Sequence, residues 1–372
     1  MLTGVRVLDF TRVLAGPLCT MILGDLGARV VKVERPGSGD ETRGWGPPFD
    51  AHGESAYYLS INRNKLSVVA DIGQPDDQAF LRGLVAGADV VVDNFRPGTL
   101  ERRGLDPTAL LAANPRLVWC TISGFGPERD RPGYDFVAQA ECGWMAITGD
   151  PEGAPMKAGV ALADVVAGKD AAIAVLGALL AVARANAANE PPPSAAARRL
   201  HVSLAASATA ALVNVAQNAL VTGREPRRWG NAHANLVPYQ LFAAADRPIV
   251  VAVGSDAQWV ACARALDLDH LASDPALATN AGRLAHRERV VSALAARLHE
   301  RDAGDWLARL DDAGVPAGRV KGILEVLADV DASALTGVAS SVPGGSVRRP
   351  PPRLDEHGPA VRAHGWHAFE GE

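Results

Sequence analysis

The chain of 372 residues is long enough to form a large core and two domains. Its composition, with 48% apolar and 21% charged residues, is that of a soluble globular protein. The 37 basic and 42 acidic residues leave a net charge of −5, so neither nucleic acid nor a membrane surface is expected as a partner.

The first residues and the apolar runs predict a cytoplasmic protein. The start of the chain lacks the basic and apolar regions of a signal peptide, and the longest uncharged apolar run, 171–183, is shorter than the ~20 residues of a spanning helix. The four cysteines show no C-x-x-C spacing, and the nine histidines show no paired spacing. We therefore expect free core thiols, no disulfide framework and no metal.

Short apolar runs alternate with helix-like segments through the first 122 residues. This alternation predicts an α/β fold with a doubly wound, Rossmann-like parallel sheet, in which ligands bind beyond the carboxyl ends of the strands. The G-x-G-x-x-G fingerprint is missing, since the first loop offers only Ala15-Gly-Pro, so no nicotinamide cofactor is expected. The expected strands are 5–10, 29–34, 67–72, 89–93 and 117–122, and the expected helices are 18–26 and 76–86.

The second half of the chain changes character after residue 224. An Ala-rich run, 201–218, predicts a helix, and two short strands across a turn, 239–242 and 249–253, predict a hairpin followed by the helices 256–266, 280–298 and 303–312. We therefore divide the chain into four parts. They are a large α/β domain (1–197), a linker helix (198–223), a smaller α+β domain (224–330) and a C-terminal segment that returns to the large domain (331–372).

A single carboxylate, Asp164, stands between an apolar segment, 160–163, and a long Ala/Leu/Val run that predicts a helix. A carboxylate at a helix entrance has two interpretations. It caps the free N–H groups of the first turn, which is the commoner role, or it is held in a dry site as a nucleophile. This stretch alone does not decide between them.

Six motifs in order resemble family III CoA-transferases, the family of formyl-CoA transferase, carnitine-CoA transferase and α-methylacyl-CoA racemase. The resemblance runs from Leu2 to about His357. The motifs are Val7-Leu-Asp-Phe-Thr-Arg-Val-Leu-Ala-Gly-Pro, Gly27-Ala-Arg-Val-Val-Lys-Val-Glu-Arg-Pro-Gly-Ser-Gly-Asp, Asn62-Arg-Asn-Lys, Asp93-Asn-Phe-Arg-Pro-Gly, Gly133-Tyr-Asp-Phe-Val-Ala-Gln-Ala and Gly159-Val-Ala-Leu-Ala-Asp.

The resemblance implies that Asp164 is the nucleophile and that coenzyme A, as a substrate thioester, binds the large domain. It also implies an interlocked homodimer with acyl-CoA and small carboxylic acids as its other partners. Arg12, Arg43 or Arg63 is expected to receive a distal carboxylate, and Gly230 and Asn231 to cover the site. The implied CoA contacts are Leu14, Ala15, Arg35, Asn62, Asn64, Lys65, Asn94, Phe95, Arg96, Arg102, Gly124, Phe125 and Tyr134.

The resemblance implies that CoA transfer passes through mixed anhydrides and an aspartyl-CoA thioester on Asp164. It also implies succinyl-CoA as a candidate acyl-CoA donor. A helix N-terminus beside Asp164 is expected to keep its carboxylate ionised. The racemases carry a histidine at the position of Tyr134, and a phenol, with a pKa of about 10, is a poor base. A racemase therefore remains the second hypothesis, and a non-catalytic acyl-CoA-binding protein the third.

Overall fold

The computed structural model describes residues 1–370 and divides the chain into two compact units. Unit 1 comprises Met1–Trp144, Lys157–Arg224 and the chain from Val330 onward. Unit 2 comprises Met145–Met156 and Glu225–Asp329, so 145–156, which we assigned to the large domain, packs with the later segment. Each unit is described by itself below.

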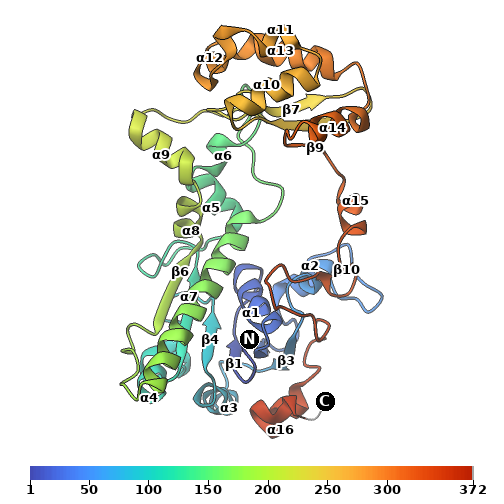
Figure 1. The fold of residues 1–372 in the computed structure, drawn as a ribbon. Helices are drawn as coiled ribbons and strands as arrows, with labels where there is room; N and C mark the ends of the chain where they lie inside the picture. Colours follow the sequence, from blue (N-terminus) through green and yellow to red (C-terminus); the bar gives the residue numbers. More distant parts are fainter. Residues whose placement is uncertain (371–372) are drawn as a thin grey trace. The chain divides into compact units, whose positions relative to one another are not determined.

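Unit 1 is built on a six-stranded sheet in the order β3-β2-β1-β4-β5-β6, in which every neighbouring pair is parallel (Figure 1). This confirms the α/β class and the parallel sheet. The strand order reverses between β1 and β4, which is where ligands bind in open parallel sheets. The strands are β1 (Arg6–Asp9), β2 (Arg29–Glu34), β3 (Lys65–Val69), β4 (Val90–Asp93), β5 (Val118–Ser123) and β6 (Arg199–Ser203).

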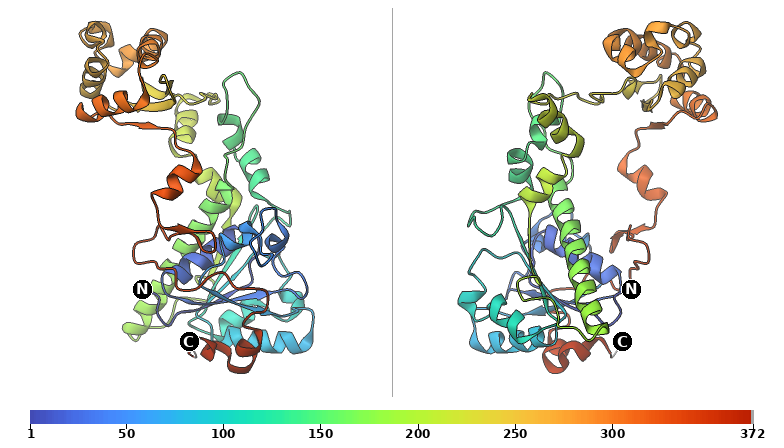
Figure 2. Two further views of the ribbon diagram at one scale, coloured as in Figure 1. Left: turned by 90° about the vertical axis from the view of Figure 1, so that its right-hand side faces the viewer. Right: turned by 60° about the vertical axis from the view of Figure 1, so that its left-hand side comes forward.

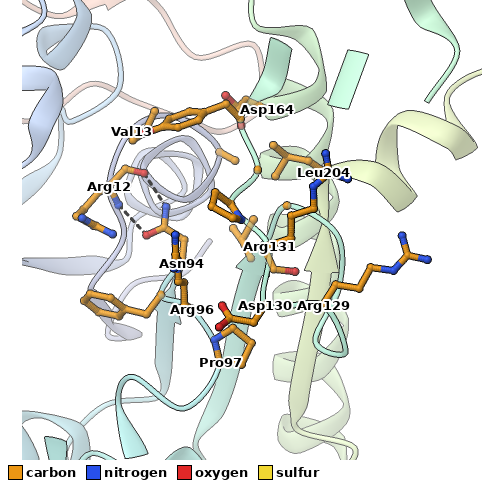
Figure 3. A pocket seen from close by; sticks show the side chains of 18 of the residues that line it. Arg12, Val13, Asn94, Arg96, Pro97, Arg129, Asp130, Arg131, Asp164 and Leu204 are labelled. Carbon is orange, nitrogen blue, oxygen red and sulfur yellow. Dashed lines mark hydrogen bonds between the residues drawn. The ribbon is translucent and has the colours of Figure 1, made fainter. Parts of the chain in front are cut away.

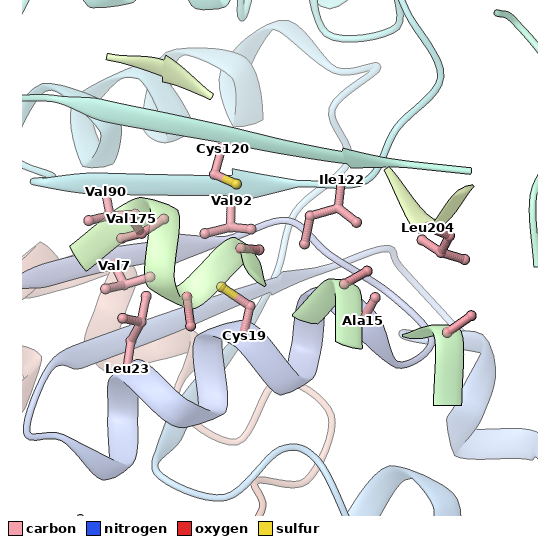
Figure 4. Close-up of a cluster of buried hydrophobic side chains, with 14 of the residues drawn as sticks. Val7, Ala15, Cys19, Leu23, Val90, Val92, Cys120, Ile122, Val175 and Leu204 are labelled. Atoms are coloured by element: carbon pink, nitrogen blue, oxygen red, sulfur yellow. The ribbon is translucent and has the colours of Figure 1, made fainter. Parts of the chain in front are cut away.

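The strands of unit 1 are apolar on both faces because helices cover both. Val7 and Val90 face a core with helices α1 and α7 (Figure 4), while the next residues, Leu8 and Val91, face a second core with α3, α4 and α16. The helices are α1 (Ala15–Asp25), α2 (Ala56–Leu59), α3 (Pro75–Ala86), α4 (Pro107–Ala113), α5 (Asp135–Glu141), α7 (Leu162–Ala187), α8 (Leu204–Ala210), α9 (Val213–Thr222) and α16 (Gly358–His364), with 3₁₀ turns at Glu41–Gly44, Glu101–Arg103 and Gly365–Phe369.

The predicted linker helix is wrong at its beginning. Residues Arg199–Ser203 form β6, which pairs in parallel with β5 and closes one edge of the sheet. Only after it does the chain become helical, in α8 and α9. The Ala-rich composition favours a helix, but ladder hydrogen bonds to β5 outweigh that local preference.

Helix α7 is longer than its uncharged run suggested. It has 26 residues and is long and apolar enough to cross a membrane, a test that the core helix of a soluble protein also passes. Figure 2 shows α7, in green, running along unit 1 beside α1. Ala163, Ala167 and Ala171 on one face are fully buried, whereas Ile173 and Leu180 are exposed. The interpretation as a buried core helix is therefore correct for one face only.

Unit 2 contains the predicted hairpin. Strands β7 (Tyr239–Ala243) and β8 (Pro248–Ala252) pair in antiparallel fashion, and β9 (Ala317–Arg319) joins β8. Trp259 and Trp306 are fully buried in its core. The helices are α10 (Asp256–Ala265), α11 (Asp269–Ala272), α12 (Asn280–Ala285), α13 (Arg287–Leu298), α14 (Ala303–Asp312) and α15 (Ile323–Ala328), with a 3₁₀ turn at Pro275–Leu277; α6 (Trp144–Ile147) begins at the last residue before this unit.

The chain from Val330 onward packs in unit 1. It forms a small two-stranded ladder, β10 (Ala332–Ser333) with β11 (Gly337–Val338), and reaches the outer edge of the main sheet. There the backbone N–H of His357 donates to the carbonyl of Ser67 on β3 at 3.1 Å.

Candidate active site

A cavity of about 260 Å³ lies in unit 1 beyond the carboxyl ends of β1, β4 and β5 (Figure 3). It contains the point where the strand order reverses, so its place follows from the topology of the sheet. Asp164 is at its wall. The other lining residues are Arg12, Val13, Leu14, Ala15, Asn94, Phe95, Arg96, Pro97, Ile122, Ser123, Gly124, Arg129, Asp130, Arg131, Pro132, Gly133, Tyr134 and Leu204.

The helix cap expected of Asp164 is supplied by another residue. Asp164 lies in the first turn of α7, and the carboxylate of Asp135, from α5, accepts from the backbone N–H groups of Ala163 at 2.8 Å and Asp164 at 3.4 Å. The second oxygen of Asp135 accepts from Gln139 at 2.7 Å. The side chain of Asp164 is therefore not used as a cap, and among residues 1–370 no hydrogen-bond donor to its carboxyl group is found.

The environment of Asp164 raises the pKa of its carboxyl group. The residue is only 7% exposed, and burial, with the charge of Asp135 second, raises this pKa to about 7. This shift is opposite in direction to the effect expected of a helix N-terminus, because burial and the neighbouring carboxylate both disfavour the charged form. A poorly solvated carboxylate without donors is a better nucleophile than a capping one.

Close backbone packing holds Asp164 beside the start of α1. One turn after Asp164, Gly168 faces the carbonyl of Ala15, and a Cβ at Gly168 would lie 2.6 Å from that oxygen. Only glycine permits this approach. No side chain caps the N-terminus of α1, and the residues at this helix start, Leu14 and Ala15, line the cavity.

Cationic side chains from three segments line the same cavity. Arg12 and Arg96 follow β1 and β4, and the segment between Gly124 and Gly133 brings Arg129 and Arg131. The two glycines touch, since a Cβ on Gly124 would lie 2.5 Å from the Cα of Gly133, so this segment leaves and returns at one point. Arg131 pairs with Glu141 and stacks on Phe125. We did not predict the arginines of this segment, because surface charge in a Gly/Pro-rich turn has no distinguishing pattern.

A second cavity of about 200 Å³ lies at the ends of β2 and β4 and shares Arg12 and Phe95 with the first. Arg35 and Ile72 line it as well. Arg35 is exposed and donates to Ser38 at 2.7 Å. An aliphatic side chain, an aromatic ring and an exposed guanidinium together suit a flat aromatic group that carries phosphates.

Five predicted site residues have side chains that are buried in internal networks and line neither cavity. Lys65 is fully buried and donates to Asp9 at 3.0 Å and to Asn62 at 2.9 Å. Asn64 and Arg63 both bind Asp25, and Arg43 binds Glu34, Glu54 and Tyr58. We expected ligand contacts at these positions, whereas their side chains pair inside unit 1, for example with Asp9 of β1 and Asp25 of α1.

The remaining predicted residues lie at other places. Tyr134 is at the cavity wall and 55% exposed. Arg102 is exposed in the turn after β4 and lines neither cavity, and Gly230 and Asn231 belong to unit 2.

Tyr57 was not predicted. Burial and then the charge of Asp164 raise the pKa of its phenol to about 12, which keeps it protonated near the nucleophile. Within residues 1–370 no group of three or more His, Cys, Asp or Glu side chains is arranged to hold a metal.

Comparison with known families decides the class of the protein. The family model described as CoA-transferase family III matches residues 2–364. The chain belongs to this family. The resemblance seen in the six motifs is thereby confirmed, and the protein is an enzyme of the family III CoA-transferases.

The relatives of this CoA-transferase carry matching names. The succinate–glutarate CoA-transferase of Agrobacterium fabrum is 38% identical over 97% of this chain and 95% of its own length. The human succinyl-CoA:glutarate CoA-transferase is 38% identical over 96% of this chain and 84% of its own. The crystal structure of a CAIB/BAIF family protein from Brucella suis, 38% identical, covers 97% of this chain and 98% of its own with a TM-score of 0.81.

Proposed function

We propose that this enzyme transfers CoA from succinyl-CoA to a dicarboxylic acid such as glutarate, with Asp164 as the nucleophile. The observation that carries the proposal is the state of Asp164, which is buried, open to the cavity and relieved of the capping role by Asp135. The named relatives at 38% identity support the choice of donor and acceptor.

The proposed reaction transfers CoA from the donor acid to the acceptor acid in four steps. The Asp164 carboxylate attacks the thioester carbonyl, which forms a mixed anhydride and releases CoA thiolate. The thiolate attacks the aspartyl carbonyl, so that an aspartyl-CoA thioester forms and succinate leaves. The acceptor carboxylate then attacks the carbonyl of this thioester, which forms a second mixed anhydride with Asp164 and again releases CoA thiolate. Attack of the thiolate on the acceptor's carbonyl gives the new acyl-CoA and restores Asp164.

The two cavities divide the proposed CoA contacts. We place the nucleotide end of CoA in the cavity of Arg35, Ile72 and Phe95, and the thioester beside Asp164 in the cavity of Leu14, Ala15, Arg96, Gly124 and Tyr134. The shared residues Arg12 and Phe95 join them, with the Arg12 guanidinium 5.4 Å from the centre of the Phe95 ring. Asn62, Asn64, Lys65 and Arg43 keep structural roles in this proposal.

The proposal is tested by trapping the covalent intermediate. The protein is incubated with succinyl-CoA, quenched in acid and digested, and the peptide containing Asp164 is expected to gain the mass of CoA less one water. Hydroxylamine should convert that adduct to a hydroxamate. Asp170→Asn, on the same helix but hydrogen-bonded to Ser207 at 2.6 Å, is the matched control and should still form the adduct. An unmodified Asp164 peptide after exposure to a panel of acyl-CoA donors would refute the covalent mechanism.

We expect Asp135→Asn to move the acidic limb of the pH profile of activity to lower pH. The amide oxygen still caps α7, but the charge that helps to raise the pKa of Asp164 is lost. Because only the ionised carboxylate attacks, wild-type kcat/KM should rise with pH through about 7, and the variant should reach its plateau earlier. The measurement is kcat/KM against pH, with Asp150→Asn, in an exposed turn, as the control. Coincident limbs for Asp135→Asn and wild type would contradict this role of Asp135.

We further propose that the enzyme acts as a homodimer in the cytosol. In unit 1 the α9 residues Leu220 and Val221 are more than 70% exposed, and in unit 2 the α15 residues Ile323 and Leu324 are as well. Large apolar side chains on a surface are typical of an interface. All four cysteines are unpaired, as is usual in a reducing compartment. Light scattering should give the mass of two chains, and an interlocked pair should not exchange tagged subunits without unfolding.

A further inference from the structure

The loop between β1 and α1 is held from three sides. The side chain of Asn94, at the end of β4, accepts from the backbone N–H of Arg12 at 3.1 Å and donates to the carbonyl of Arg12 at 2.7 Å (Figure 3). Asp40 accepts from the N–H of Val13 at 3.2 Å, and the fully buried Lys32 donates to the carbonyl of Thr11 at 2.8 Å. The backbone polar groups of three successive residues thus have fixed partners.

These contacts maintain an unfavourable conformation at Val13. Its φ is +72°, in the left-handed region that β-branched residues rarely adopt. Such a conformation persists only where the surrounding structure determines it, and such residues cluster at functional sites. The next two residues, Leu14 and Ala15, line the cavity and begin α1, so the orientation of this uncapped helix start depends on the turn at Val13.

We propose that Asn94 is a positioning residue that maintains the left-handed turn at Val13 and thereby directs the first N–H groups of α1 toward the reacting carbonyl. This inference rests on the function proposed above. Both hydrogen-bonding groups of the Asn94 side chain are already engaged with Arg12, so Asn94 acts through the backbone and not as a contact to CoA. The N–H groups of α1 then stabilise the oxyanion that forms when Asp164 or the thiolate attacks.

The test is a double-mutant cycle between Asn94 and Val13. We expect Asn94→Ala to lower kcat by about 10²-fold, as the loss of an oxyanion donor does, with KM for succinyl-CoA changed by less than about threefold. Glycine adopts positive φ at no steric cost, so the turn in the Val13→Gly variant depends less on the hydrogen bonds between Asn94 and Arg12. There the same Asn94→Ala change should lower kcat by less than about tenfold.

Asn114→Ala is the matched control, because the Asn114 side chain also bridges backbone groups, those of Ala88 at 3.1 Å and Arg116 at 3.0 Å, outside the cavity. It should leave kcat unchanged in either background. Asn94→Asp serves as a second variant should Asn94→Ala unfold; it keeps the acceptor but cannot donate to Arg12, and its loss of kcat should be rescued in the same way.

Two results would overturn the proposal. One is an equal loss of kcat in the Val13 and Val13→Gly backgrounds, and the other is a raised KM with unchanged kcat, which would mark Asn94 as a ligand contact. The function itself is judged separately, since its failure would appear as absence of the aspartyl-CoA adduct in the wild-type protein.

Discussion

Asp164→Ala is expected to lower kcat for CoA transfer by about 10⁴-fold or more while the protein stays folded. In the proposed mechanism this carboxylate carries CoA between donor and acceptor, and the neighbouring carboxylate of Asp135 is occupied at the start of α7. The measurement is the formation of glutaryl-CoA from succinyl-CoA and glutarate, followed by chromatography, with Asp170→Asn as the control that keeps activity.

The same substitution makes an independent prediction for stability. The pKa of Asp164 is raised from 3.8 to about 7 in the folded state, so ionising this group disfavours folding progressively between about pH 4 and pH 7. At pH 8 the variant should therefore unfold at an equal or higher urea concentration than wild type. A strongly destabilised Asp164→Ala would show that the carboxyl group is structural, and substantial residual transfer would show that it is not the nucleophile.

Lys65→Met is expected to lower the free energy of unfolding by about 3–5 kcal/mol. Lys65 and Asp9 are both fully buried and lie 3.0 Å apart. Burial alone would raise the pKa of Asp9, but Lys65 and then Lys32 bring it below its ordinary value. Removing Lys65 leaves a buried carboxylate with one of its two cations missing. The measurement is urea unfolding followed by circular dichroism.

The control for Lys65→Met is Lys321→Met, which removes an exposed ion pair with Asp329 and should cost less than about 1 kcal/mol. The double variant Lys65→Met with Asp9→Asn should regain part of the loss, because it removes the uncompensated charge. If the Lys65 and Lys321 variants unfold at the same urea concentration, the buried pair does not stabilise this core.

The strands of the sheet were predictable because they carry an unusual local signal. Strands such as β4 are apolar up to their last residue, since helices cover both faces of a parallel sheet, and this apolar run ends sharply at Asp93. The strand β6 was missed for the converse reason. It lies at the edge without a fully buried residue, and its identity depends on β5, 80 residues earlier in the chain, with Trp119 opposite Arg199.

For the site, the place of Asp164 at the start of a helix was predictable from the sequence, but its environment was not. Asp164 is marked by its place before a long apolar helix, whereas the cap from Asp135 joins residues almost thirty positions apart. The Lys65 and Arg63 side chains turn inward to acids from other strands and helices, which no local pattern indicates. The left-handed turn at Val13 could not be predicted from the sequence, because valine rarely adopts a positive φ.

The meeting of Gly168 with the carbonyl of Ala15 has a consequence for engineering the enzyme. At that point the backbones of the two helices approach each other, with the Leu18 side chain beside the contact, so any side chain at position 168 would push the start of α7 away from the start of α1. Variants made for thermal tolerance should therefore keep Gly168, as well as the fully buried Leu23 and Val175 between the same helices. Substrate preference should be altered instead through Arg129 and Arg131 of the 125–132 segment, which line the cavity outside this helix contact.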